Sequence, residues 1–266
     1  MKTTHEIVIS NACELANQLE NRTRRFEIPV RKKFVCNSEK VYLETPLHQL
    51  YVGGKGNPVA VKLYLAIIWF ATSKPYEIVD IPATGWATLL GLERPETSGK
   101  RRIYNALKKL QGDNLISLEN VPGRSPKITL LSENGRGEPY VLPGLAAVLD
   151  KSRNKPVQNQ NIYFKVPTSL WTQGVIQRMS GAALAFLLIL LSESANERDV
   201  WFSMDAFSNR YNFDIRTRRK GAKELIQQGL LEVTRVPMDA YGNQSFSLGT
   251  KQLRNVYRLV NLESIS

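Results

Sequence analysis

Residues 100–116 read KRRIYNALKKLQGDNLI, and residues 215–231 read IRTRRKGAKELIQQGLL. Aligning Leu110 with Leu225 brings the apolar positions of both stretches into register. Each stretch has apolar residues at helical spacing on one side, basic residues on the other, and a turn that leads into a strand. An internal repeat of a basic amphipathic helix that runs into a strand indicates two copies of a DNA-reading unit.

The charge of the chain is strongly positive, with a formal net charge of +12 and a pI near 9.7. Most of the excess lies in residues 151–266, which hold 16 basic and 9 acidic residues. The basic residues cluster between Arg210 and Lys223. Such a cluster is typical of a phosphate-binding surface, and the alternative is an ordinary solvated face.

Cysteine and histidine are scarce, and they predict neither a metal site nor a cofactor. The two cysteines are Cys13 and Cys36, the two histidines are His5 and His48, and no pair has metal-ligand spacing. The start of the chain lacks a secretory leader pattern. The longest apolar run, residues 181–191, is about half a membrane span, so we expect a buried helix in a cytoplasmic, nucleoid-associated protein.

The expected elements follow the same order in both halves: buried helix, short strand, short helix, basic helix and β-hairpin. In the first half they cover residues 58–73, 77–81, 83–90, 100–110, 115–119 and 127–131. In the second half they cover residues 181–192, 200–202, 203–211, 215–226, 230–236 and 254–260. Ser203 and Asp214 are expected to cap the short and basic helices of the second half, and Thr97 or Ser98 the basic helix of the first.

Residues 1–50 precede this repeat. A helix is expected at residues 6–21, and residues 26–30 and 31–35 look strand-like and basic. Two interpretations stay open, namely an extension packed on the first domain and a basic arm that touches the DNA backbone. Residues 150–161, rich in Lys, Arg, Asn, Gln and Pro, are the expected linker between the halves.

This order of elements resembles the winged helix-turn-helix domain, here twice. The resemblance implies an α+β fold with two winged helix-turn-helix domains in tandem, residues 51–149 and 162–266, after a basic N-terminal extension, residues 1–50. It also implies that the third helix of each domain lies in the major groove of DNA. Arg124 and Lys127 in one domain, and Met238 to Gln244 in the other, correspond to the wings.

The residues expected to bind DNA lie opposite the apolar stripes, near the start of the second basic helix, or in the first wing. They are Arg101, Arg102, Asn105, Lys108, Lys109, Arg124, Lys127, Arg216, Thr217, Arg218, Arg219, Lys220 and Lys223. We expect Arg102 and Arg216 to read bases and Lys109, Lys220 and Lys223 to contact phosphates. Gly221, inside the second basic helix, indicates close approach to either a packing partner or DNA.

Double-stranded DNA is therefore the expected partner, bound by one chain or by a homodimer. A transcriptional regulator is the first hypothesis, and a plasmid or mobile-element replication initiator, which the tandem arrangement also resembles, is the second. The third is a winged-helix adaptor that binds protein. An adaptor has no reason to carry like charges at helical spacing, which destabilise a helix.

An enzyme is not expected. The glycine-rich run at residues 53–56 lacks both a preceding strand pattern and the Lys-Ser/Thr ending of a phosphate loop. With two histidines near the N-terminus and scattered carboxylates, the sequence offers no catalytic set.

Overall fold

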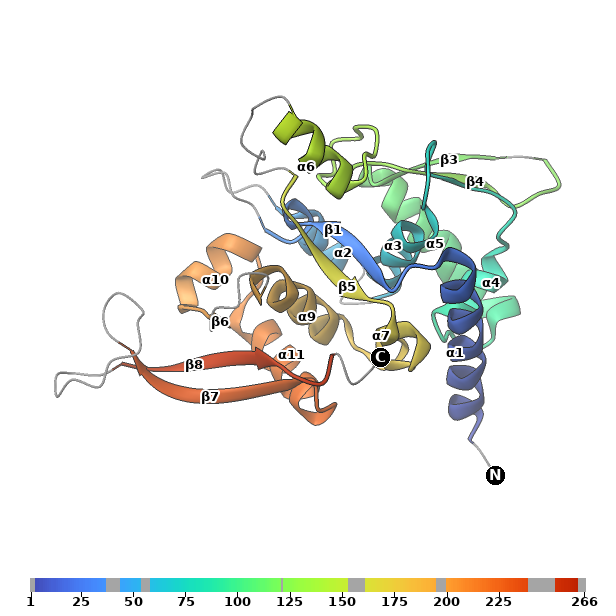
Figure 1. Ribbon diagram of the computed structural model, residues 1–266. Helices are drawn as coiled ribbons and strands as arrows, with labels where there is room; N and C mark the ends of the chain where they lie inside the picture. The colour runs from blue at the N-terminus through green and yellow to red at the C-terminus, as the bar shows by residue number, and fades with distance from the viewer. Residues whose placement is uncertain are drawn as a thin grey trace.

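The computed structural model describes residues 3–36, 44–53, 58–120, 122–152, 161–194, 200–238 and 252–262. The fold is of mixed helix and sheet, with two sets of elements in the same order (Figure 1). The first set comprises α3 (Val59–Phe70), β2 (Glu77–Ile78), α4 (Ala83–Leu89), the π-helical turn η2 (Pro95–Gly99), α5 (Lys100–Gly112), β3 (Ile116–Glu119) and β4 (Lys127–Leu130). The second comprises α9 (Gly181–Ser194), β6 (Val200–Trp201), α10 (Met204–Tyr211), α11 (Ile215–Gln227), β7 (Leu231–Met238) and β8 (Gln252–Leu259).

Each set contains a three-stranded antiparallel sheet of the same topology, made of its early short strand and its closing hairpin. The strand order is β2-β4-β3 in the first half and β6-β8-β7 in the second, so the last strand is central in both. The two hairpins extend to opposite sides of the molecule in Figure 1, β3–β4 to the right and β7–β8 to the left. The expected order of elements is confirmed in both halves.

A third group of elements lies outside the two repeated sets. It consists of α1 (Thr4–Thr23), β1 (Glu27–Arg31), the 3-10 turn η1 (Lys32–Phe34), α2 (Pro46–Gly53), α6 (Pro143–Ser152), β5 (Tyr163–Pro167), α7 (Ser169–Thr172) and α8 (Val175–Arg178). The linker expected at residues 150–161 begins inside α6, and residues 153–160 lie outside the described part of the chain. Residues 32–34, expected to be strand-like, form a helical turn instead.

The N-terminal extension packs on both halves. Strand β1 pairs with β5 in antiparallel register, from Glu27 opposite Pro167 to Arg31 opposite Tyr163, and the two strands lie side by side in Figure 1. Helix α1 packs against α4 of the first half and α7 of the second. Gly174, at φ +71°, allows this approach, because a Cβ there would lie 2.7 Å from a methyl of Ile9 in α1.

Three basic side chains of the extension bond to other parts of the protein. The Arg25 guanidinium donates to the carbonyl oxygens of Ile68 and Thr72 at the end of α3. Arg31 pairs with the buried carboxylate of Glu133, Nη1 to Oε2 2.5 Å, and Lys32 pairs with Glu193 of α9 at 2.9 Å. At these three positions the extension is packed on the rest of the protein, as the first interpretation expects, and does not form an arm toward DNA.

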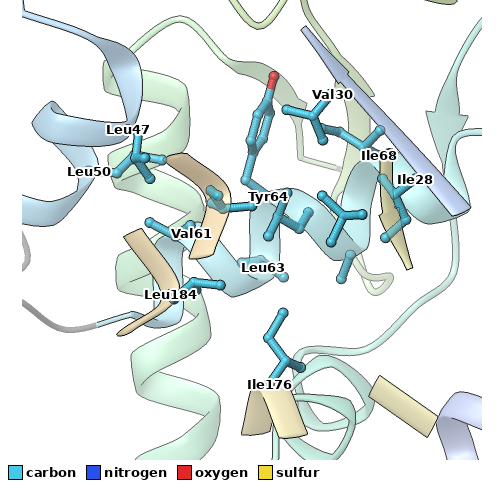
Figure 2. Packing of buried hydrophobic residues seen from close by; sticks show 14 of the residues in the cluster. Ile28, Val30, Leu47, Leu50, Val61, Leu63, Tyr64, Ile68, Ile176 and Leu184 are labelled. Atoms are coloured by element: carbon cyan, nitrogen blue, oxygen red, sulfur yellow. The ribbon is translucent and has the colours of Figure 1, made fainter. Parts of the chain in front are cut away.

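The hydrophobic core is continuous across the two halves, because α3 and α9 are buried along most of their length and share neighbours. Figure 2 shows side chains of α3 surrounded by others from both halves. Labelled there are Val61, Leu63, Tyr64 and Ile68 of α3, Leu47 and Leu50 of α2, Ile28 and Val30 of β1, Ile176 of α8 and Leu184 of α9.

A buried lysine lies at this junction. Lys62 of α3 is 4% exposed, and its Nζ donates to the backbone oxygen of Gln177 in α8 at 3.1 Å. Burial, together with the nearby charge of Arg102, lowers the pKa of Lys62 to about 7, and Glu224 opposes that shift. Gln177 in turn donates from Nε2 to the carbonyl oxygens of Leu89 and Trp171 at 3.1 Å.

Helices α9 and α11 touch at a glycine. A Cβ on Gly221 would lie 2.5 Å from the backbone oxygen of Ala182 and 2.8 Å from Cβ of Phe186. Neither of these atoms can move without shifting α9. The close approach expected at Gly221 is therefore toward a packing partner, not toward the exposed face of the helix.

We predict that Lys62→Met changes the pH dependence of stability. Between pH 7 and the ordinary lysine pKa of 10.5, the unfolded chain holds one proton more than the folded chain. The destabilisation by Lys62 is therefore full below pH 7 and is relieved as pH rises toward 10.5. The stability advantage of Lys62→Met should be constant below pH 7 and fall by about 1.4 kcal/mol per pH unit above it. Urea unfolding of both proteins between about pH 6 and about pH 10 measures this. A difference that does not vary with pH would show that Lys62 stays charged throughout.

We predict that Gly221→Ala destabilises the protein by about 2 kcal/mol, because overpacking against α9 outweighs the roughly 1 kcal/mol gain in helix propensity. Gly112 of α5 is the matched control, since a Cβ there meets no atom within 4 Å. Gly112→Ala should leave stability unchanged or raise it by up to about 1 kcal/mol. Urea unfolding measures the stability of both variants. Equal gains in stability at the two positions would contradict the packing argument.

Candidate nucleic-acid interface

The helix-turn-helix of the second half is built by two side-chain caps and a tight turn. Ser203 Oγ accepts a hydrogen bond from the amide of Ala206 at 3.1 Å and begins α10. The turn after α10 starts at Asn212, whose φ of 62° is a left-handed conformation that asparagine tolerates. Asp214 then caps α11, with Oδ1 accepting from the amide of Thr217 at 2.6 Å. Both expected caps are confirmed.

The hydrogen bonds that the Asp214 side chain accepts also shift the pKa of its carboxyl group. The backbone amide of Thr217 is the main cause that lowers the pKa of Asp214 below its ordinary value. The carboxylate therefore stays charged at the helix N-terminus, where negative charge is favourable. In the first half the expected cap is wrong, because no side chain caps α5. There η2 runs directly into the helix, and Ser98 donates its hydroxyl to the oxygen of Glu93 instead.

One face of α11 is exposed and basic. Its buried residues are Gly221, Ala222 and Leu225, which pack on α9 and the core, together with Arg218. The exposed side chains include Arg216, Arg219, Lys220 and Lys223, and Thr217 is half-buried. The one acidic residue within α11, Glu224, accepts from the amide of Ser180 at 2.8 Å and from its hydroxyl, so it ties the helix to the start of α9.

Arg218 departs from the expected pattern. Its side chain is buried rather than exposed, and its guanidinium lies over the ring of Phe207 in α10, 5.1 Å from the ring centroid. It cannot touch DNA in this conformation. Arg218 was expected to bind DNA because of its charge and its place near the start of the helix, where arginine side chains are mostly exposed.

Helix α5 presents a similar but less basic face. Ile103, Ala106, Leu107 and Leu110 are buried. Arg101, Arg102, Asn105 and Lys108 are exposed, as expected, and so is Tyr104. Lys109 is half-buried and pairs with Asp113 at 2.7 Å, beside a polar pocket that Glu44 and Asn114 also line.

The two hairpins that correspond to the expected wings differ in charge. In the first, Arg124 is exposed, whereas Lys127 pairs with Glu119 at 2.6 Å and lies 3.6 Å from Glu77. The hydrogen bond to Glu119 is the main cause that raises the pKa of Lys127. Lys127 is thus a cation already matched by two carboxylates, and Arg124 is the better candidate for a DNA contact.

The second wing carries arginines that the sequence analysis missed. Arg235 and Arg258 are exposed on β7 and β8, and Arg254 lies over the ring of Trp201 at 4.1 Å. Their charge within the strands expected at residues 230–236 and 254–260 was the signal that could have found them. Of the expected wing, Met238 ends β7, and residues 239–244 lie outside the described part of the chain.

Neither a membrane helix nor a metal cluster occurs within the ranges that the structure describes. No helix there is long and apolar enough to cross a membrane. No group of three or more His, Cys, Asp or Glu side chains there could hold a metal ion.

Residues 177–231 match the family model of a helix-turn-helix domain. The match runs from α8 through α9, α10 and α11 to the first residue of β7, and so covers the second half up to its hairpin. No curated protein and no solved structure matched the chain. The match supports double-stranded DNA binding through a helix-turn-helix domain whose second helix is the capped, basic α11.

Proposed function

We propose that the chain is a sequence-specific DNA-binding protein that reads double-stranded DNA with two winged helix-turn-helix heads. The second head comprises the helix-turn-helix match and its hairpin, and the first comprises the elements from α3 to β4. The observation that carries the proposal is the basic face of α11, in which four exposed cations face outward and the single acid is bonded to Ser180. Phosphate contacts from such a face supply affinity, and arginines near the helix start can read base edges.

The second reading head is proposed on the internal repeat. Helices α5 and α11 have identical lengths, and their bounds superpose on the alignment of Leu110 with Leu225. Their hairpins have the same topology. Joined through a common core, the heads would approach DNA as one unit and bind two half-sites about one helical turn apart without needing a second chain.

Transcriptional regulation by occupancy of such a site is the role we favour. A replication initiator that binds origin repeats would use the same two heads, and it is the second candidate. The basic faces of α5 and α11 count against an adaptor that binds only protein. We propose no catalytic step for this chain. Selection from a random duplex library gives the bound site. Iterated copies of that site near the gene would separate the first two roles, because such an array is typical of an origin and favours the initiator.

We predict that Arg216→Ala and Lys223→Ala weaken DNA binding in different ways. Loss of a base contact by Arg216→Ala should cost about 1–3 kcal/mol on the selected site and reduce discrimination against a scrambled duplex. Lys223→Ala should weaken binding to both duplexes alike and lower the slope of log K on log salt by about 0.9. Fluorescence anisotropy titrations at several salt concentrations measure both quantities. Arg22→Ala, an exposed arginine on α1, is the control and should leave both unchanged.

These titrations also test the function itself. With roughly six to ten phosphate contacts, the wild-type slope should lie near −5 to −9. Absence of any complex at about 50–100 mM salt would overturn DNA binding and favour the adaptor.

We predict that removing the cations of α5 shortens the footprint. A variant with Arg101, Arg102 and Lys108 changed to alanine should protect about one half-site instead of two, roughly 10 base pairs less. The matched variant changes Arg216, Arg219 and Lys220 and should lose most of the affinity. Hydroxyl-radical footprinting of both variants on the selected site measures this. An unchanged footprint in the α5 variant would show that only the second head reads DNA.

A further inference from the structure

The position that Arg218 occupies in α11 is filled by an isoleucine in α5. The alignment that superposes the two helices places Arg218 on Ile103. Ile103 is 0% exposed and belongs to the hydrophobic core, and Arg218 is 9% exposed. The fold therefore accepts an aliphatic side chain at this position in one half and a guanidinium in the other.

Within the described ranges, Arg218 lies against an aromatic ring and forms no ion pair. Its guanidinium lies over Phe207, which is 1% exposed and packs against Phe186, Phe202 and Tyr211. Nε and Nη1 of Arg218 are buried and have no hydrogen-bond partner among the described residues. Among the charged pairs in the described ranges, none includes Arg218, whereas the buried Arg31 has Glu133.

Such an arrangement does not serve stability. A cation–π contact compensates only part of the loss when guanidinium N–H donors leave water without acceptors. An isoleucine would fill the same volume without that loss, as Ile103 does in α5. A charge placed where it weakens the fold is a candidate for a role in binding.

The location of Arg218 in α11 indicates a role in binding DNA. It lies one turn after the Asp214 cap, in the part of α11 that enters the groove first in helix-turn-helix docking, and its neighbours in sequence Arg216 and Arg219 are exposed. An arginine side chain is long enough to keep its stem packed while its head group moves outward. The acceptor it lacks is the kind that a DNA phosphate supplies, through charge-assisted hydrogen bonds.

We propose that Arg218 is a stored phosphate contact, held over Phe207 in the free protein and turned outward onto the DNA backbone in the complex. This inference rests on the proposed function. The unpaired guanidinium weakens the free state and is satisfied only in the complex, so the difference appears as affinity for DNA. The contact is independent of sequence, so it raises affinity for any duplex and not the discrimination between duplexes.

The test compares wild type with Arg218→Ile, which copies α5, and Arg218→Lys, which keeps the charge. The probe is a mixed-sequence duplex of about 30 base pairs, long enough for two half-sites one turn apart. Arg218→Ile should unfold at the same temperature as wild type or higher, bind about ten-fold more weakly at low salt, and show a slope of log K on log salt lower by about 0.9. Arg218→Lys should keep the wild-type slope.

A readout independent of affinity is the NMR signal of the Arg218 Nε–H group, assigned by its absence from Arg218→Ile. The proposal expects this signal to shift on addition of the duplex as the guanidinium leaves the ring of Phe207. The proposal is overturned if the signal does not move, or if Arg218→Ile keeps the wild-type slope.

The outcomes also separate this inference from the proposed function. If wild type does not bind the duplex, the proposed function fails. If wild type binds and Lys223→Ala lowers the slope but Arg218→Ile does not, only the role of Arg218 fails.

Discussion

The pairing of β1 with β5 is the contact on which the arrangement of the two halves depends. Strand β1 comes from the N-terminal extension and β5 opens the second half, yet their inward side chains, Ile28, Val30, Phe164 and Val166, all enter one core. Full burial of each contributes about 1.5–3 kcal/mol. Because α1 also packs on both halves, α5 and α11 are held at a fixed relative position. A chain built only from two domains and a linker would lack this constraint.

Local signals predicted the repeated elements well. The caps Ser203 and Asp214, the helical periods and the offset between α5 and α11 are all readable within a few turns of sequence, and the structure has them. The β1–β5 ladder was not predictable in this way. Its strands are five residues long and lie more than 130 residues apart, and nothing in the sequence of residues 27–31 specifies its partner. The role of the extension as a joint between the halves therefore came only from the structure.

The exposure of most residues of the candidate site was predicted correctly. The basic residues that are buried, or that pair with carboxylates of the protein, were not recognised. Arg218 and Lys62 break the rule that places charged side chains outside, so residue type alone assigns them wrongly to the surface. The pairing of Lys109 with Asp113 was visible in principle, because residues four apart on a helix are neighbours. The pairing of Lys127 with Glu119 depends on the register of the β3–β4 hairpin, which the sequence left open.

These differences make the two proposed heads unequal. In the second head α11 is capped and carries four exposed cations, whereas in the first head Lys109 and Lys127 are matched by carboxylates. Once the second head has bound, contact by the first becomes an intramolecular step at high effective concentration, because a rigid core rather than a flexible linker joins them. A weak first head is then sufficient to fix the register of the protein on its site. Under the proposed function, the unequal distribution of charge would suit a two-headed reader, since two strong heads would add non-specific affinity without adding discrimination.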